Sequence, residues 1–126
     1  MEPKILEKLG LTRNESIVYL SLLQLGTSKT GKILESSRLN SGKIYEILNS
    51  LKIKGLVSES IINNIRHFTA SPPSQLLEYI EKKKEAIELE EKSIKPYLNQ
   101  LEKLQKETAK EVKASTYIGF RGLKTA

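Results

Sequence analysis

Residues 27–68 narrow the choice of fold more than any other part of the chain. They read as a short helix, a tight turn, a second helix within LNSGKIYEILNSLKIKGLV, and a two-stranded hairpin. The second helix has apolar residues at helical spacing, which predicts one buried face: Ile44, Ile47, Leu48 and Leu51. This order of elements is typical of a winged helix-turn-helix, which lays one helix into the major groove of DNA. The pattern therefore favours nucleic-acid binding over catalysis.

The flanking residues predict where these elements begin and end. Thr12 and Glu15 stand three apart before an apolar run, which is the pattern of a capping box at a helix start. Thr27 or Ser28 is expected to cap the next helix. Residues 56–62 and 65–70 are rich in β-branched and aromatic residues, and Asn63-Asn64 between them suits a tight hairpin turn. We therefore predict a two-stranded wing.

A heptad pattern follows from Pro73 to about Lys113. Its apolar residues predict a long helix that dimerises as a coiled coil, although Lys83 and Glu90 occupy positions where apolar residues would be expected. The predicted dimerisation residues are Leu76, Ile80, Ile87, Ile94, Tyr97, Leu101 and Leu104. Two alternatives stay open: a solvated helix that lies partly along its own domain, and a helical hairpin that buries the seam within one chain.

Pro96 interrupts this helical pattern, and a proline inside a helix removes a hydrogen bond and clashes with the preceding turn. We therefore expect a kink or break near residue 96. The resulting domain prediction is a winged helix-turn-helix over 1–72, a dimerising helix over 73–113, and a tail over 114–126. In this tail, Tyr117, Ile118 and Phe120 suggest a strand. The predicted fold class is mainly α, with a two-stranded wing and a long C-terminal coiled-coil helix.

Composition bounds the function. The chain has 126 residues with a net charge of +6, and this balance favours polyanions such as DNA. The excess is present within 27–68, although a generally basic surface is the alternative. The absence of cysteine excludes disulfides and thiol catalysis, and we expect no metal and no cofactor. With no long apolar segment and no signal-peptide pattern, the expected location is cytoplasmic, without a membrane partner.

The candidate DNA contacts lie on the second helix of the pair and on the elements beside it. Ser41 and Asn49 can reach base edges, Gly42 permits close approach, and basic side chains suit phosphates. Arg66 suits a minor-groove or phosphate contact. The predicted DNA-binding residues are Lys29, Lys32, Ser41, Gly42, Lys43, Tyr45, Asn49, Lys52, Asn64 and Arg66.

Three side chains have a second interpretation. Tyr45 could pack against the wing, and Glu46 is better explained by pairing with a lysine than by contact with a cytosine. His67 is the only histidine, so it is interpreted as a wing residue and not as a metal ligand or catalytic base. The chain has no patterned set of nucleophile, base and acid, and we therefore predict that it is not an enzyme. An enzyme accessory or nuclease domain is the least favoured alternative.

Several segments together resemble one protein family. LGLTRNESIVYLSLLQLG, KIYEILNSLKIKGLV and RHFTASPPSQLLEYI resemble the N-terminal region of the TrmB-like archaeal transcription regulators over roughly residues 6–110. The resemblance implies a homodimeric repressor or activator that binds palindromic promoter DNA. Family members usually continue into a sugar-binding domain, and the tail resembles its first strand. The chain is then either a fragment or a short regulator without a ligand pocket, so sugar sensing is not carried over and the effector is unknown.

These observations lead to one functional hypothesis and one main alternative. The hypothesis is a sequence-specific regulator that binds double-stranded DNA, with two copies placing two helices in successive major grooves. Many family relatives have a basic residue where this chain has Ser41, so base specificity does not follow from the resemblance. The alternative is a protein-interaction winged-helix module of the transcription machinery, in which the coiled coil recruits another protein.

Overall fold

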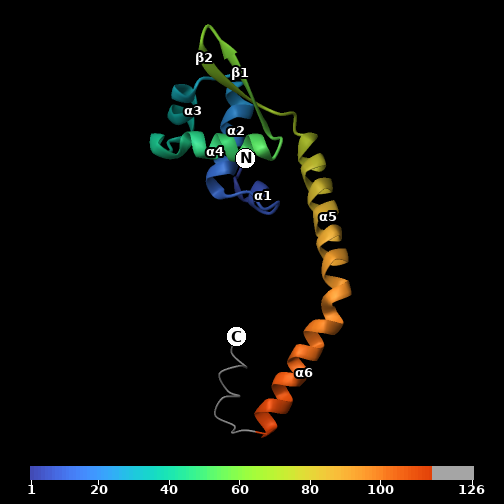
Figure 1. Ribbon diagram of the computed structural model, residues 1–126. Coiled ribbons are helices and arrows are strands. Elements are labelled where there is room, and N and C mark those ends of the chain that lie inside the picture. Colours follow the sequence, from blue (N-terminus) through green and yellow to red (C-terminus); the bar gives the residue numbers. More distant parts are fainter. Residues whose placement is uncertain (115–126) are drawn as a thin grey trace. The chain divides into compact units, whose positions relative to one another are not determined.

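The computed structural model describes residues 1–114 and divides the chain into two compact units, one of which is Met1–Lys83 and the other of which starts at Lys84. The elements follow one another as α1 Lys4–Glu7, α2 Arg13–Leu25, α3 Thr30–Ser37, the 3-10 turn η1 Ser41–Lys43, α4 Ile44–Ile53, β1 Val57–Ile62, β2 Ile65–Ala70, α5 Gln75–Ile94, the 3-10 turn η2 Lys95–Tyr97 and α6 Leu98–Ala114. Figure 1 shows the first unit as a helical cluster with a β-hairpin projecting from it. The sequence-based prediction of a mainly α fold with a two-stranded wing is confirmed.

Helix α2 lies at the centre of the first unit and contacts α1, α3, α4 and β2. Its start is the predicted capping box: the Thr12 hydroxyl accepts from the Glu15 amide, and the Glu15 carboxylate accepts from the Thr12 amide. Val18, Tyr19 and Leu22 are buried along its inner side. The capping pattern therefore places the start of α2 correctly.

The prediction that Thr27 or Ser28 caps α3 is wrong. Lys29 occupies the N-cap position, and no side chain caps this helix. The backbone of Ser28 instead exchanges two hydrogen bonds with Phe68 on β2, and the Thr27 hydroxyl pairs with that of Thr69 at 2.8 Å. The extended backbone at Ser28 therefore forms an isolated antiparallel bridge with β2 of the wing. Because Thr27 and Ser28 both contact the wing, neither hydroxyl is placed to cap α3.

The turn between α3 and α4 depends on two special residues. Arg38 has a φ of 60° and ends α3 in the left-handed conformation. The Asn40 side chain then accepts a hydrogen bond from the Gly42 amide at 3.0 Å, which caps η1 and leads directly into α4. Leu39 between them packs against the core. The turn therefore holds α3 and α4 as a helix-turn-helix pair.

The wing is an antiparallel hairpin in which Val57 pairs with Ala70 and Ile62 with Ile65. Asn63 and Asn64 connect the strands with φ values of 52° and 62°. Positive φ at both central residues is the signature of a type I′ turn, whose twist matches that of the flanking strands. The predicted hairpin and its Asn-Asn turn are confirmed.

The core of the first unit joins α1, α2, α3, α4 and both strands through buried side chains. Its members are Leu6, Leu11, Val18, Tyr19, Leu22, Ile33, Ile44, Ile47, Leu48, Leu51, Leu56, Val57 and Phe68. The Tyr19 hydroxyl donates to the Ser71 carbonyl at 2.9 Å, which satisfies the one polar atom of this buried ring. Phe68 brings the base of the wing into the same core.

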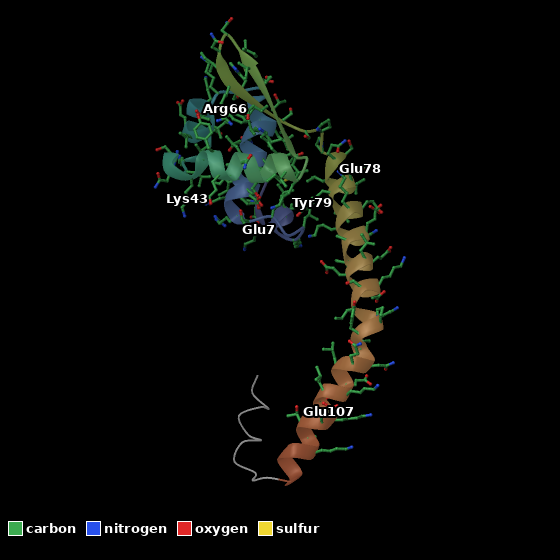
Figure 2. All side chains as sticks on the ribbon, viewed as in Figure 1. Glu7, Lys43, Arg66, Glu78, Tyr79 and Glu107 are labelled. Atoms are coloured by element: carbon green, nitrogen blue, oxygen red, sulfur yellow. The ribbon has the colours of Figure 1, made fainter. Side chains whose placement is uncertain are left out.

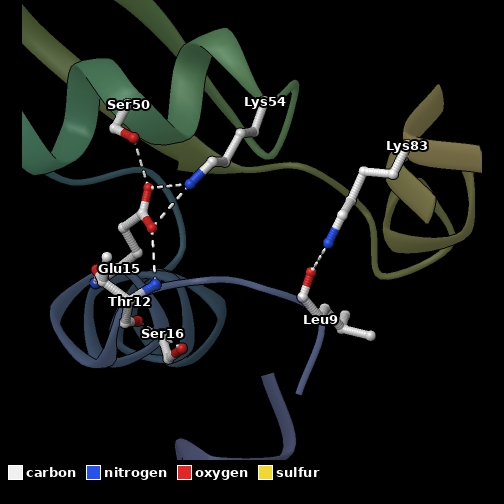
Figure 3. A network of polar contacts seen from close by, with 7 residues as sticks. All are labelled: Leu9, Thr12, Glu15, Ser16, Ser50, Lys54 and Lys83. Carbon is white, nitrogen blue, oxygen red and sulfur yellow. Dashed lines mark hydrogen bonds and ion pairs between the residues drawn. The ribbon is translucent and has the colours of Figure 1, made fainter. Parts of the chain in front are cut away.

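The first turns of α5 belong to the first unit. Leu76 and Tyr79 pack against its core, and the Lys83 ammonium donates to the Leu9 carbonyl (Figure 3). The Lys83 ammonium also lies 5.3 Å from the centre of the Tyr79 ring. The residue that interrupts the heptad seam, Lys83, therefore anchors α5 to the first unit. The predicted domain boundary at residue 72 remains a prediction, but the compact unit itself extends to Lys83.

The second unit contains the rest of α5, η2 and α6. The α-helix gives way to the 3-10 turn at Lys95–Tyr97, which contains Pro96, where the sequence predicted a kink or break. The large apolar side chains of the second unit are exposed, including Ile87, Ile94, Tyr97, Leu101 and Leu104.

Within residues 1–114, every helix is too short or too polar to cross a lipid bilayer. The predicted strand at 117–120 lies outside the described residues.

Candidate nucleic-acid interface

Helix α4 and the turn before it present the predicted DNA-reading face. Ile44, Ile47, Leu48 and Leu51 are buried, as predicted from their spacing. The opposite side is exposed and carries Ser41, Gly42, Lys43, Tyr45, Glu46 and Asn49. Figure 2 shows Lys43 at the start of α4 and Arg66 on the wing.

Gly42 lies on the exposed face without any packing need for a glycine. A Cβ at this position would meet only the Asn40 Oδ1 atom, at 3.6 Å. The Gly42 amide already donates to that same oxygen. The absence of a side chain therefore leaves room outside the chain, where a ligand could approach the backbone closely.

An open groove of about 700 Å³ lies between the start of α3, the start of α4 and the tip of the wing. Its lining residues are Lys29, Thr30, Gly31, Lys32, Glu35, Tyr45, Asn64, Ile65 and Arg66. Five of the predicted DNA-binding residues meet here although they are far apart in sequence: Lys29, Lys32, Tyr45, Asn64 and Arg66. The other five lie on η1 and α4 outside the groove lining: Ser41, Gly42, Lys43, Asn49 and Lys52.

The start of α3 adds backbone donors to this groove. The N-cap residue Lys29 has an extended backbone and no side-chain hydrogen bond, so no side chain occupies the amides of the first turn. Such amides carry the positive end of the helix dipole and can bind an anion. Lys29 and Lys32 supply positive charge at the same place, while Glu35 one turn later is the negative charge in the lining.

A carboxylate on the wing pairs with two of the predicted DNA contacts. Glu59 Oε1 accepts from Lys52 Nζ at 2.8 Å and from Arg66 Nη2 at 2.9 Å, and Glu59 Oε2 accepts from Arg66 Nε at 2.9 Å. Hydrogen bonds from Arg66 and then from Lys52 lower the pKa of Glu59 to about 2. The same pairing with Glu59 raises the pKa of Arg66. Glu59 and Arg66 are therefore both ionised at neutral pH.

Tyr45 joins this cluster to α4. The Arg66 guanidinium lies 4.7 Å from the centre of the Tyr45 ring, and the Tyr45 and Phe68 rings meet edge to face at 6.5 Å. The alternative interpretation of Tyr45, packing against the wing, is confirmed, and 47% of the residue still remains exposed. His67 is half-buried on the wing, with Nδ1 2.9 Å from the Ile65 carbonyl oxygen.

A second network of hydrogen bonds connects α4 to α2 through the Glu15 carboxylate. Glu15 accepts from Ser50 at 2.5 Å and from Lys54 at 2.6 and 2.8 Å, in addition to the Thr12 amide (Figure 3). Burial raises the pKa of Glu15, but the hydrogen bonds from Lys54, Ser50 and Thr12 outweigh burial and the pKa lies below its ordinary value. The network ties the start of α2 to the last turn of α4, and so holds the exposed face in place.

Sequence reasoning missed Glu59 and the partners of Glu15. The strand alternation offered a signal for Glu59, because Glu59 pairs with Phe68 and therefore lies on the same face of the wing as Arg66. No local pattern links Glu15 to Ser50 and Lys54, which are 35 and 39 residues away. Contacts of this kind depend on how α2 and α4 pack.

Comparison with known proteins places the chain in a family. Residues 6–74, more than half of the chain, match the family described as "Sugar-specific transcriptional regulator TrmB". The chain belongs to the TrmB family. The match covers the winged helix-turn-helix of this TrmB-family chain and ends just before α5.

One curated relative is similar in sequence to part of the chain. The TrmB-family chain is 45% identical over 60 residues to the HTH-type sugar sensing transcriptional regulator TrmBL1 of Pyrococcus furiosus. This alignment covers 45% of the chain but only 18% of that relative. The chain therefore spans less than a fifth of the length of the curated relative that it matches.

Solved structures match the fold at low sequence identity. TrmBL2, described as an archaeal chromatin protein with a novel mode of DNA binding, superposes with a TM-score of 0.70 at 20% identity, over 85% of the chain and 42% of TrmBL2. YusO of Bacillus subtilis gives 0.51 at 19% identity, over 90% of the chain and 84% of YusO. A MarR-family regulator from Silicibacter pomeroyi gives 0.51 at 13% identity, over 86% and 75%. These likenesses support the fold of the TrmB-family chain.

Proposed function

We propose that this TrmB-family chain regulates transcription by binding double-stranded DNA sequence-specifically, as a homodimer on a palindromic promoter site. One observation carries the proposal: the exposed face of α4 stands beside a groove where basic side chains from α3 and the wing meet. This arrangement fits a duplex, because a helix can enter the major groove while cations on either side bind phosphates. The sequence identity with TrmBL1, which is named a transcriptional regulator, adds support.

Each part of the surface has a proposed role. Ser41 and Asn49 reach base edges, and Gly42 allows the backbone to approach the duplex. Lys43, Lys29 and Lys32 bind phosphates, the last two beside the amides that begin α3. On the wing, Asn64 and Arg66 contact the phosphate backbone of the DNA or its minor groove. Tyr45 and Lys52 border this surface, but they also contact the wing cluster.

The homodimer is proposed to form through α5 and α6. The exposed apolar side chains of α5 and α6 recur at heptad positions, and two such helices would bury them together. Ile80, Ile87, Ile94, Tyr97, Leu101 and Leu104 form the proposed seam, whereas Leu76 already packs against the core of its own unit. Two joined copies would place half-sites about 10 base pairs apart, or at a multiple of that spacing.

The proposal is tested by selecting duplexes from a random DNA library at physiological salt and then measuring affinities. Replacing Lys43 by Ala should weaken binding to all duplexes alike and reduce the slope of log affinity against log salt by about 0.9, the value for one phosphate contact. Lys8→Ala is the matched control, because Lys8 is an exposed lysine that ends α1 and is not part of the proposed DNA-binding surface. It should leave affinity and slope unchanged.

Two outcomes would contradict the proposal. If Lys43→Ala left both affinity and salt slope as in the unmodified protein, the face of α4 would not be the DNA contact. If the unmodified protein recovered no duplex at all, the protein-interaction module would become the better explanation. The exposed apolar residues of α5 and α6 would then be the place to seek a protein partner.

A further inference from the structure

Glu59 stands at the junction of the wing and the recognition helix α4. It lies on β1, and its carboxylate joins Arg66 on β2 to Lys52 on α4. Its side chain is 16% exposed, whereas those of Lys52 and Arg66 are 35% and 48% exposed. One carboxylate is therefore enclosed by two cations that remain accessible from outside. All three residues come from different elements, so the cluster exists only in the folded protein.

The Arg66 guanidinium is held in one orientation by this arrangement. Glu59 accepts from Nε and Nη2 in a two-bond fork, and the guanidinium carbon lies over the Tyr45 ring, 4.7 Å from its centre. A forked pair of this kind adds geometric specificity as well as energy. The Nη1 nitrogen takes no part in the fork, so the end of Arg66 that carries it can donate to a ligand in the groove that Arg66 lines.

The same carboxylate lowers the net charge of the cluster. Lys52 and Arg66 would bind phosphates of any sequence if they were unpaired, because phosphate contacts carry no sequence information. With Glu59 between them, the cluster has a net charge of +1. Non-specific attraction is reduced, while the oriented end of Arg66 stays available for a directional hydrogen bond.

We infer that Glu59 is a positioning residue that determines specificity: it holds Arg66 against Tyr45 in one orientation and restrains Lys52 and Arg66 from binding phosphates indiscriminately. The inference rests on the proposed DNA-binding function. It assigns to a negative side chain, on a surface rich in basic residues, the role of discriminating between sequences. The ligand class is duplex DNA, which the oriented Arg66 reads through a groove edge or through groove width.

The test compares Glu59→Gln with Glu35→Gln in the full chain. Both substitutions remove one negative charge, and Glu35 lines the same groove as Arg66 but belongs to α3. The probes are a duplex selected from the random library by the unmodified protein and a scrambled duplex of the same length. For Glu59→Gln we expect the affinity ratio of selected to scrambled duplex to fall about tenfold, a size typical for loss of one specific base contact. Its salt slope should steepen by about one to two as the freed cations reach phosphates.

Three further measurements separate positioning from a change of charge or stability. Glu35→Gln should keep the affinity ratio within about twofold, because it does not touch the Arg66 fork. Arg66→Lys retains the charge but cannot form the fork, so it should lower the ratio as Glu59→Gln does. In an Arg66→Ala background, Glu59→Gln should cause no further loss of the ratio. Circular dichroism confirms that each variant is folded.

The outcomes distinguish this inference from the function on which it rests. If the unmodified protein binds no duplex, the proposed function fails. If it binds duplexes without sequence preference, DNA binding stands and the specificity role of Glu59 is wrong. The role is equally wrong if the protein has a preference that both Glu59→Gln and Arg66→Lys retain, or if Glu35→Gln lowers the ratio as much as Glu59→Gln. If Glu59→Gln unfolds the wing, the affinity ratio of Arg66→Lys alone decides whether the fork determines specificity.

Discussion

Glu15 shows how one carboxylate can have two structural roles. It completes the capping box of α2 by accepting a hydrogen bond from the Thr12 amide. It also accepts hydrogen bonds from Ser50 in α4 and from Lys54, the residue that follows α4. Its side chain is 4% exposed, so its charge depends on these partners and not on water. Since the hydrogen bonds outweigh burial, the pKa of Glu15 lies below its ordinary value, and the ionised form stabilises the fold.

This lowered pKa predicts a pH-dependent loss of stability. A group with a lowered pKa in the folded state contributes fully above about pH 5, and the contribution is lost as the pH falls through the lowered value. Glu15→Gln should reduce the free energy of unfolding by about 1–3 kcal/mol at pH 7. In urea unfolding, the gap between this variant and the unmodified protein should narrow at about pH 3. The exposed Glu2→Gln is the control, and an equal gap at both pH values would contradict the assignment.

Among the elements, the hairpin turn of the wing depends on the residue type at two positions. Asn63 and Asn64 both have positive φ, which asparagine tolerates and β-branched residues avoid. The turn matters for function as well, because Asn64 lines the groove beside Arg66. Its geometry fixes the register that places Arg66 on the same face as Glu59.

Substitution of Asn63 tests this turn. Asn63→Val should lower the free energy of unfolding by about 1–2 kcal/mol, since a left-handed conformation brings its Cβ too close to the following carbonyl. Asn63→Gly should stay within about 0.5 kcal/mol of the unmodified protein, because glycine adopts positive φ without this clash. Urea unfolding measures both variants. Equal stability of the two would show that the turn does not require positive φ at this position.

At the scale of the whole molecule, the long helical segment takes part in both units. Leu76, Tyr79 and Lys83 attach the first turns of α5 to the winged helix-turn-helix. The apolar residues of the later turns are exposed, and Ile94 and Leu101 are 47% and 48% accessible. We propose that this change along one segment marks the transition from intrachain packing to the dimer contact.

The proposed dimer is tested by sedimentation of the full chain. Replacing Ile94 and Leu101 together by Lys should convert a dimer into a monomer, because charged residues at two heptad positions cannot be buried against a partner helix. Asn99→Lys is the control, since it adds a lysine at an exposed position of α6, the helix that carries Leu101. Affinity for a duplex with two half-sites should fall in the double variant, which loses the gain from linking two binding units.

A monomeric unmodified protein would show that the long-helix dimer is wrong. In that case a different protein partner would become the better explanation of the exposed seam. A chain that ends at Lys84 is a second comparison, because it keeps the turns of α5 that pack on the core of the first unit. It should sediment as a monomer if the dimer contact lies beyond that point.

Local chemistry accounts for most of the architecture. The capping box at Thr12, the apolar spacing of α4 and the Asn63-Asn64 turn were all readable from neighbouring residues, because helix caps, helix periodicity and tight turns depend on a few positions at short range. The family resemblance was readable for the same reason, since its motifs lie in these segments and residues 6–74 match the family.

Long-range packing accounts for what the residue pattern did not reveal. Ser28 pairs with the wing instead of capping α3, Lys83 anchors α5 instead of weakening a seam, and Glu59 holds two residues that were predicted only as DNA contacts. Each of these interactions joins different elements, and the free energy of a polar side chain depends on which partner the fold brings within hydrogen-bonding distance. That choice is made when the elements pack, and the order of residues along the chain does not specify it locally.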